Sequence, residues 1–283
     1  MAPTLFASRG AVLPDRAISS RGGSSKNASV SLDISGGVAQ VKLSHPGKLN
    51  AMSRAMWRQL RDVFVAVQQD PGVRCVVISG QGGHFCAGGD ISEYVDFRFD
   101  EAMLRDFHEG DVWGGLAAIL ECDAPVIAQI EGNCMGAGLE IASCCDIRIA
   151  GHSARFGAPI AKLGFPMAPR EAALVMQAVG ELTAREMLLA AGVLDATRMA
   201  QRGFLNSVED DANVESAVKA TAVRICKLAP GAARLNKQSM RPLSQVIRSL
   251  EATNLIANAY QYAASDEHRE GVTAFVEKRQ PNF

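Results

Sequence analysis

The sequence predicts an α/β core with substantial parallel pairing, followed by a mainly helical C-terminal region. Two observations predict the core: short apolar strands alternate with helical segments, and two of these strands end in glycine-rich turns that lead into helices. From about residue 171 onward the apolar periodicity is nearly all helical. We therefore expect a leader at residues 1–29, a core at 30–200 and a helical region at 201–283.

The folded part opens with a predicted β-hairpin at residues 30–34 and 38–43. Both segments alternate apolar and polar residues, and Gly36-Gly37 between them supplies the turn. Ser53 can then cap a helix that we expect to reach about residue 70, because its apolar residues recur at helical spacing.

The remaining elements continue this alternation of strands and helices. Uninterrupted apolar runs predict buried strands at residues 74–79, 125–130 and 146–150. Helical periodicity predicts helices at residues 101–121, 184–191, 195–202, 214–228 and 243–264, with a short helix before the third strand.

The composition is that of an ordinary globular chain that can bury one sizeable core. It has 283 residues, of which 48% are hydrophobic and 21% charged, with a formal net charge of -1. A nucleic-acid-binding surface needs a basic excess, which this chain lacks. No apolar run approaches the ~20 residues that a membrane-spanning helix needs. We therefore expect neither a nucleic-acid nor a membrane partner.

The first 29 residues and the cysteines bear on location. Residues 1–29 are rich in Ser, Ala and Gly and carry four basic residues against one acid. We expect a disordered leader and a cytoplasmic protein; the alternative is a mitochondrial presequence and a matrix location.

The seven cysteines are odd in number and form no CxxC pair, which favours reduced, buried thiols over a zinc site.

The glycine-rich turns at residues 84–90 and 132–140 carry the strongest functional signal. Neither turn matches a dinucleotide-binding or P-loop motif. Each offers backbone N–H groups without obstruction from side chains, and two such groups that meet at one oxygen form an oxyanion hole. The alternative is that these glycines only permit tight turns and close packing.

Six motifs, in order and spacing, resemble the crotonase (enoyl-CoA hydratase/isomerase) family. They are LNA at 49–51, FCAGGD at 85–90, GAGLE at 136–140, CDIR at 145–148, RFGAP at 155–159 and EGVTAFVEKR at 270–279. The resemblance covers roughly residues 30–283. It implies a spiral of ββα turns of the crotonase/ClpP-like type with a helical C-terminal trimerisation region. It also implies an acyl-CoA substrate, no metal or other cofactor, and a homotrimer or dimer of trimers.

The resemblance also assigns site residues. The N–H groups of Ala87 and Ala137 would form the oxyanion hole that stabilises a thioester enolate. The CoA-binding residues would be Lys48, Leu49, Ala87, Gly88, Gly89, Asp90 and Lys278, with the two lysines near the pantetheine or the phosphates. Surface charge without a ligand is the alternative for both lysines.

Glu140 lies where the family has its first catalytic glutamate, and a helix-start glutamate favoured by the dipole is the alternative. Hydratases of the family usually carry a second glutamate directly after the proline of the RFGAP-like motif, but here Pro159 is followed by Ile160. Glu171 and His108 are the candidates for a replacement acid or base. Other candidates, each more simply explained as structural, are Glu93, Tyr94, Glu109 and Trp113.

We therefore expect enoyl-CoA hydration or double-bond isomerisation with Glu140 as acid/base. The alternatives are a decarboxylase or hydrolase of acyl-CoA, because decarboxylation needs enolate stabilisation more than two glutamates, and a CoA-binding homologue without turnover.

Overall fold

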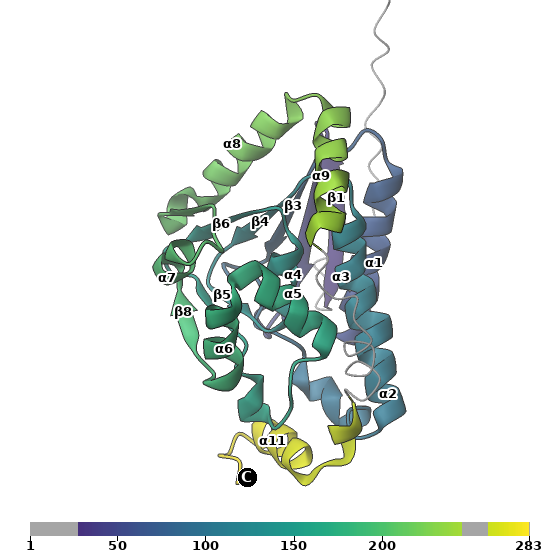
Figure 1. Ribbon diagram of the computed structural model, residues 1–283, viewed down its shortest axis with the longest axis vertical. Helices are drawn as coiled ribbons and strands as arrows, with labels where there is room; N and C mark the ends of the chain where they lie inside the picture. The colour runs from purple at the N-terminus through teal and green to yellow at the C-terminus, as the bar shows by residue number, and fades with distance from the viewer. Residues whose placement is uncertain (1–27, 245–259, 283) are drawn as a thin grey trace, which may run out of the picture.

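The computed structural model describes residues 28–244 and 260–282, which form two β-sheets surrounded by helices (Figure 1). The larger sheet has the spatial order β1 (Ser29–Ser35), β2 (Val38–Ser44), β3 (Cys75–Gly80), β4 (Val126–Ile130), β6 (Ile147–Gly151) and β9 (Ser207–Glu209). The smaller sheet has the order β5 (Asn133–Met135), β7 (Arg155–Gly157) and β8 (Val193–Asp195).

Helices join and cover these strands. The α-helices are α1 (Arg54–Gln69), α2 (Glu101–Arg105), α3 (Trp113–Glu121), α4 (Ala137–Cys144), α5 (Pro169–Val179), α6 (Glu181–Leu189), α7 (Ala196–Gln201), α8 (Val214–Cys226), α9 (Pro230–Ser244) and α11 (Asp266–Val276). Short 3-10 turns are η1 (Ile91–Asp96), η3 (Ile160–Leu163), η4 (Asp211–Asn213) and η5 (Gln261–Ala264), and η2 (Asp106–Val112) is a π-helical segment.

The hairpin and the parallel core are confirmed. Strands β1 and β2 pair antiparallel, and β2, β3, β4, β6 and β9 then pair parallel in that order. Ser53 caps α1 as expected, since its side chain accepts a hydrogen bond from the Met56 N–H at 3.2 Å. Because β3 and β4 are parallel neighbours, their carboxyl ends, and the glycine-rich turns that follow them, lie at the same edge of the sheet.

The two faces of the larger sheet bury different helices. Side chains that alternate along β3 explain this, because Cys75 and Val77 join a cluster with α8, whereas Val76 and Ile78 join the main core with α1. In Figure 1, α1 and α3 lie side by side along one side of the sheet, and α8 lies on the other.

The predicted helix at residues 101–121 is not regular. It contains the π-helical segment η2, in which the Trp113 N–H donates to the carbonyl of His108, five residues earlier. A π turn widens the helix and changes the direction of the side chains that it carries. This segment therefore controls where His108 points, and periodicity alone could not predict it.

The C-terminal region, expected to be nearly all helical from about residue 171, also contains two short strands. The short strands β8 and β9 interrupt it, because each adds to the edge of an existing sheet. Helices α6, α7 and α8 correspond to the predictions at residues 184–191, 195–202 and 214–228. Most of the helix predicted at 243–264, like nearly all of the leader at 1–29, lies outside the described residues.

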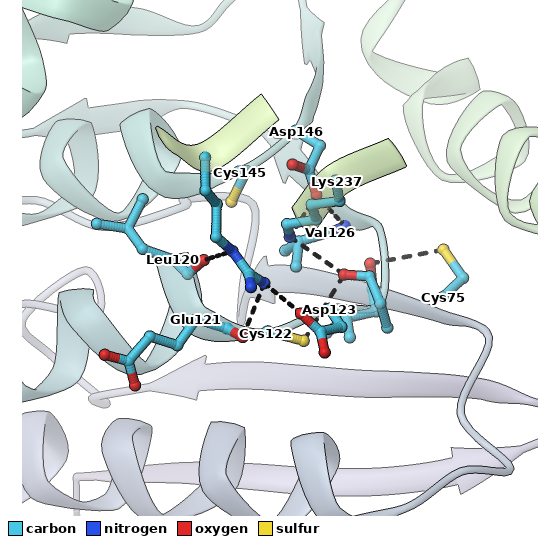
Figure 2. Close-up of polar contacts among 12 residues, drawn as sticks. Cys75, Leu120, Glu121, Cys122, Asp123, Val126, Cys145, Asp146 and Lys237 are labelled. Carbon is cyan, nitrogen blue, oxygen red and sulfur yellow. Dashed lines mark hydrogen bonds and ion pairs between the residues drawn. The ribbon is translucent and has the colours of Figure 1, made fainter. Parts of the chain in front are cut away.

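Two basic side chains, one lysine and one arginine, attach α9 to the core, and Figure 2 shows the contacts of the lysine. Lys237 Nζ donates to Asp146 Oδ2 at 2.7 Å and to the carbonyl of Ala124 at 3.1 Å, and only 7% of the lysine is exposed. Arg241 binds the Asp123 carboxylate at 2.7 Å and backbone carbonyls at the C-terminal end of α3. A cation at the C-terminus of α3 donates hydrogen bonds to its last carbonyls and interacts favourably with its dipole. Charge as well as burial therefore holds α9 against the core.

Within residues 28–244 and 260–282, none of the helices has both the length and the hydropathy required to cross a bilayer.

Candidate active site

The two glycine-rich turns lie against one another. The Cys86 N–H donates to the carbonyl of Asn133 at 2.8 Å, and the Met135 N–H donates back to the carbonyl of Cys86 at 2.9 Å. A Cβ atom added at Gly136 would lie 3.6 Å from the Cα of Gly88, so the turns are in van der Waals contact. Segments 47 to 49 residues apart in the chain thus form one site.

Backbone hydrogen bonds correct one predicted donor of the oxyanion hole. The Ala87 N–H donates to the carbonyl of Leu49 at 3.0 Å, so it is not available to a thioester oxygen. The assignment of Ala87 as oxyanion donor is therefore wrong. Sequence could not reveal this pairing, because Leu49 reaches the turn from a loop more than 35 residues earlier.

The N–H group of Gly89, two residues after Ala87, is available instead. The Met52 N–H donates to the carbonyl of Gly88, and the Asp90 N–H donates to the carbonyl of Met52, both at 2.8 Å. These two bonds direct the Gly89 N–H away from Met52. This N–H has no hydrogen-bond partner among the described residues. The Ala137 N–H begins α4 and likewise has none within the described part of the chain. Gly89 and Ala137 therefore offer two unpaired donors on adjoining turns.

Glu140 lies in the first turn of α4, three residues after Ala137, as expected. Its side chain is only partly accessible. Burial first, and the negative charge of Glu171 second, raise the pKa of Glu140 to about 8, although the positive charge of Arg98 opposes them. Glu140 is therefore mainly protonated near neutral pH, which suits a proton donor.

Glu171 and His108, both named from the sequence, meet in the structure. Glu171 is 2% exposed in the first turn of α5, which packs against α4. His108 Nδ1 lies 3.1 Å from Glu171 Oε1. Because the charge on Glu171 raises the pKa of Glu140, the two carboxyl groups act electrostatically as a pair.

Arg98 is a residue of this site that sequence analysis missed. It is fully buried, with its guanidinium 3.3 Å from Nε2 of His108, 3.3 Å from Nε2 of His268 and 3.1 Å from Oη of Tyr262. It also stacks over the rings of Tyr94 and Phe165. In the sequence, an arginine with no motif around it is most simply interpreted as a surface charge. Arg98 is buried by His268 and Tyr262, which lie more than 160 positions away.

Ile160 begins η3 and packs against the main core. It borders a cavity of about 620 Å³ with mostly apolar walls, among them Phe165, Met167, Leu188 and Tyr262. An isoleucine cannot transfer a proton. Any second acid or base must therefore come from another element.

Among the predicted CoA-binding residues, Lys48 and Asp90 form an ion pair, whereas Leu49 and Lys278 are exposed. Lys48 Nζ lies 2.7 Å from Asp90 Oδ2, and Asp90 also accepts hydrogen bonds from Ser92. Burial alone would raise the pKa of Asp90, but the hydrogen bonds from Lys48 and Ser92 outweigh it and lower that pKa. Leu49 is 45% exposed beside this pair, and Lys278 is exposed just after α11.

The remaining candidates have local partners. Glu93 accepts a hydrogen bond from the Arg54 N–H at 2.9 Å, and Glu109 accepts one from Tyr260 Oη at 2.6 Å. The Arg170 guanidinium lies over the ring of Trp113. These contacts account for all three residues structurally. Tyr94 is different, because a side chain at Gly89 would overlap its hydroxyl, so this phenol lies beside the proposed donor.

All seven cysteines are free thiols, and six of them are buried. Across residues 28–244 and 260–282, no three His, Cys, Asp or Glu side chains are grouped so that they could hold a metal ion.

Comparisons with known proteins agree with this architecture. A family model described as enoyl-CoA hydratase/isomerase matches residues 33–283. Crotonyl-CoA hydratase from Syntrophomonas wolfei is 32% identical, covering 87% of this chain and 94% of the relative. An enoyl-CoA hydratase/carnitine racemase from Magnetospirillum magneticum superimposes with a TM-score of 0.74 at 33% identity, covering 90% of this chain and 94% of that one. A methylmalonyl-CoA decarboxylase gives a TM-score of 0.80 at 25% identity, covering 90% and 97%. These likenesses confirm the spiral fold.

Proposed function

The chain belongs to the enoyl-CoA hydratase/isomerase family, and from this premise we propose that it hydrates the double bond of an enoyl-CoA, or moves it, with Glu140 and Glu171 as its two carboxyl groups. One observation carries the proposal: Glu140 lies in the helix turn that the unpaired Ala137 N–H begins, and burial and the charge of a second buried carboxyl, Glu171, raise its pKa.

The N–H groups would act on the thioester carbonyl. With its oxygen between Gly89 and Ala137, negative charge that develops on the enolate meets two donors already in place. Such donors typically contribute about 3–4 kcal/mol each to transition-state stabilisation. The positive end of the α4 dipole adds to them.

The carboxyl groups would handle water and proton. Hydration needs a base that activates water for attack on the β carbon and an acid that delivers a proton to the α carbon. Glu140 suits the acid, because its raised pKa keeps it protonated near neutrality. Glu171 suits the base, because a hydrogen bond from His108 holds its carboxylate in place. The second glutamate would thus have moved from the position of Ile160 to the start of α5.

A decarboxylase is the second candidate. Two observations favour it: Ile160 in place of a glutamate, and the likeness to methylmalonyl-CoA decarboxylase. Loss of CO₂ from a malonyl-type thioester leaves an enolate, which needs the same N–H groups and one proton donor. Glu171 has no evident task in that reaction, and for this reason we rank hydration first.

The test is the ultraviolet absorbance of crotonyl-CoA mixed with the wild-type protein and with Glu140→Gln, Glu171→Gln and Glu186→Gln. We expect loss of the conjugated thioester with wild type, and rates lowered at least ~10²-fold in the first two variants. Glu186 is a partly exposed carboxylate of α6 paired with Arg198 and Arg202, so Glu186→Gln should keep the wild-type rate.

The outcomes separate the candidates. Wild-type rates in Glu171→Gln, with activity lost in Glu140→Gln, would contradict the second carboxyl but not hydration. No change of crotonyl-CoA with wild type, together with release of CO₂ from a malonyl-type thioester, would replace hydration by decarboxylation.

A further inference from the structure

The setting of Arg98 is unusual for a buried cation. It is 0% exposed, and among the described residues no carboxylate lies within ion-pair distance of it. Neutral or aromatic groups surround it instead: His108, His268 and Tyr262 accept its hydrogen bonds, and two aromatic rings cover its faces. Taking a guanidinium out of water is costly unless its charge is compensated.

Its hydrogen bonds fix the protonation of the histidine next to it. A guanidinium can only donate, so His108 Nε2 must accept from Arg98, and we assign the ring as neutral with its proton on Nδ1. The Nδ1–H group then donates to Glu171 Oε1, with Nδ1 and Oε1 3.1 Å apart. The three residues therefore form one chain of hydrogen bonds, donated from Arg98 to His108 and from His108 to Glu171.

His268 is fixed in the same way. Its Nε2 accepts from Arg98 Nε, and its Nδ1 donates to the carbonyl of Ala263 at 3.0 Å. Burial, with a contribution from Arg98, lowers the pKa of His268 to about 4. The guanidinium thus remains the positive charge of this cluster over the neutral range of pH.

We propose that Arg98 is a positioning residue of the active site, which acts through a neutral His108 to keep the Glu171 carboxylate ionised and correctly oriented. On this view Glu171 is the counter-ion that Arg98 lacks in direct contact. His108 is then a connector and not itself the acid or base. The kinetic part of this inference rests on the proposed function; the ionisation of Glu171 does not.

Several groups share this electrostatic environment. Tyr94 from η1, His108 from η2, Tyr262 from η5 and His268 from α11 face Arg98. Glu140 and Tyr260 are the further groups that feel the charge of Glu171. On Glu140 the two charges oppose one another: Glu171 raises its pKa and Arg98 lowers it.

The experiment compares wild type with Arg98→Gln, Arg98→Lys and, as matched control, Tyr262→Phe. Tyr262→Phe removes one hydrogen bond of Arg98 but neither its charge nor its path to Glu171. Two quantities are measured: the pH dependence of kcat/KM for crotonyl-CoA, and the titration of the glutamate carboxyl carbons by ¹³C NMR in the free enzyme. Glu140→Gln and Glu171→Gln identify the two resonances.

In Arg98→Gln we expect the lower of the two coupled carboxyl pKa values to rise by about one unit, because a compensating positive charge has gone. The acidic limb of kcat/KM should move to higher pH, which lowers the rate about tenfold on that limb. Arg98→Lys should largely restore the limb, and Tyr262→Phe should leave it in place.

An unshifted titration in a folded Arg98→Gln variant would overturn the inference, as would equal shifts in Tyr262→Phe. Should Arg98→Gln fail to fold, His108→Phe takes its place. Loss of the histidine connector should raise the same pKa, and an unchanged value would again overturn the inference. The NMR titration needs no substrate, so failure of the proposed reaction cannot be mistaken for failure of this inference.

Discussion

At the residue scale, the proton on Glu140 links stability to catalysis. Burial and the charge of Glu171 raise its pKa from an ordinary value of 4.5 to about 8. The folded protein therefore binds this proton more tightly than the unfolded chain does. Linkage then requires that the folded state lose stability as pH rises from about 4.5 to about 8, since folding in that range must take up a proton.

Glu140→Gln should remove this dependence, because glutamine resembles the protonated acid in shape and does not titrate. We expect similar melting temperatures of variant and wild type near pH 5, and an increasing advantage of the variant up to about pH 8, beyond which the difference levels off. Calorimetry of both proteins from pH 5 to 9 measures it. Because Glu140 is partly accessible, the gain should amount to only a few kcal/mol. A difference that is constant with pH would contradict the raised pKa.

The sequence could predict some of these residues and not others. Glu140 was found because it lies within a contiguous motif. Glu171 was only one of several candidates, since its role depends on α5 packing against α4. Arg98 gave no signal, and Ala87 was misassigned, because both outcomes depend on hydrogen bonds to distant segments.

At the scale of elements, the turn that begins α4 illustrates what local pattern can and cannot give. The apolar strand, the glycines and the helix were all predictable. The short strand β5 was not, because its three residues are strand only by pairing with β7. The close approach of the two turns likewise depends on the missing side chain of Gly138, where a Cβ atom would lie 2.6 Å from the carbonyl oxygen of Cys86.

Gly138→Ala should therefore separate the two turns. We expect a loss of about 1–3 kcal/mol in the free energy of unfolding, from overpacking against backbone that cannot move freely. Hydratase activity should fall further than stability, because Gly89 and Ala137 must stay aligned. The matched control is Gly231→Ala in α9, where nothing lies within 4 Å of the new methyl group. Urea denaturation and the crotonyl-CoA assay measure both effects, and equal results for the two variants would contradict the role of this contact.

At the scale of the whole molecule, the parallel sheet could be predicted because apolar runs and crossovers constrain it strongly. The C-terminal region could not be predicted to the same extent. Its helix α9 is fixed by Lys237, which binds Asp146 (Figure 2), and by Arg241, which binds Asp123. Such long-range contacts leave no periodic signal in the sequence. Strands β8 and β9 are similarly defined by the sheet edges that they join.

The surface of α6 leads to a prediction about assembly. Leu182 and Leu189 lie seven residues apart on one face of this helix and are 81% and 75% exposed in the single chain. Large apolar side chains exposed together favour an interface, and we expect the trimer or dimer of trimers that the family resemblance implies. Replacing both leucines with aspartate should place charges in that interface and lower the molar mass measured by light scattering after gel filtration. The control Lys219→Asp changes an exposed residue of α8 and should leave the mass unchanged. A wild-type monomer, or an unchanged mass in the folded double variant, would place the interface elsewhere or exclude it.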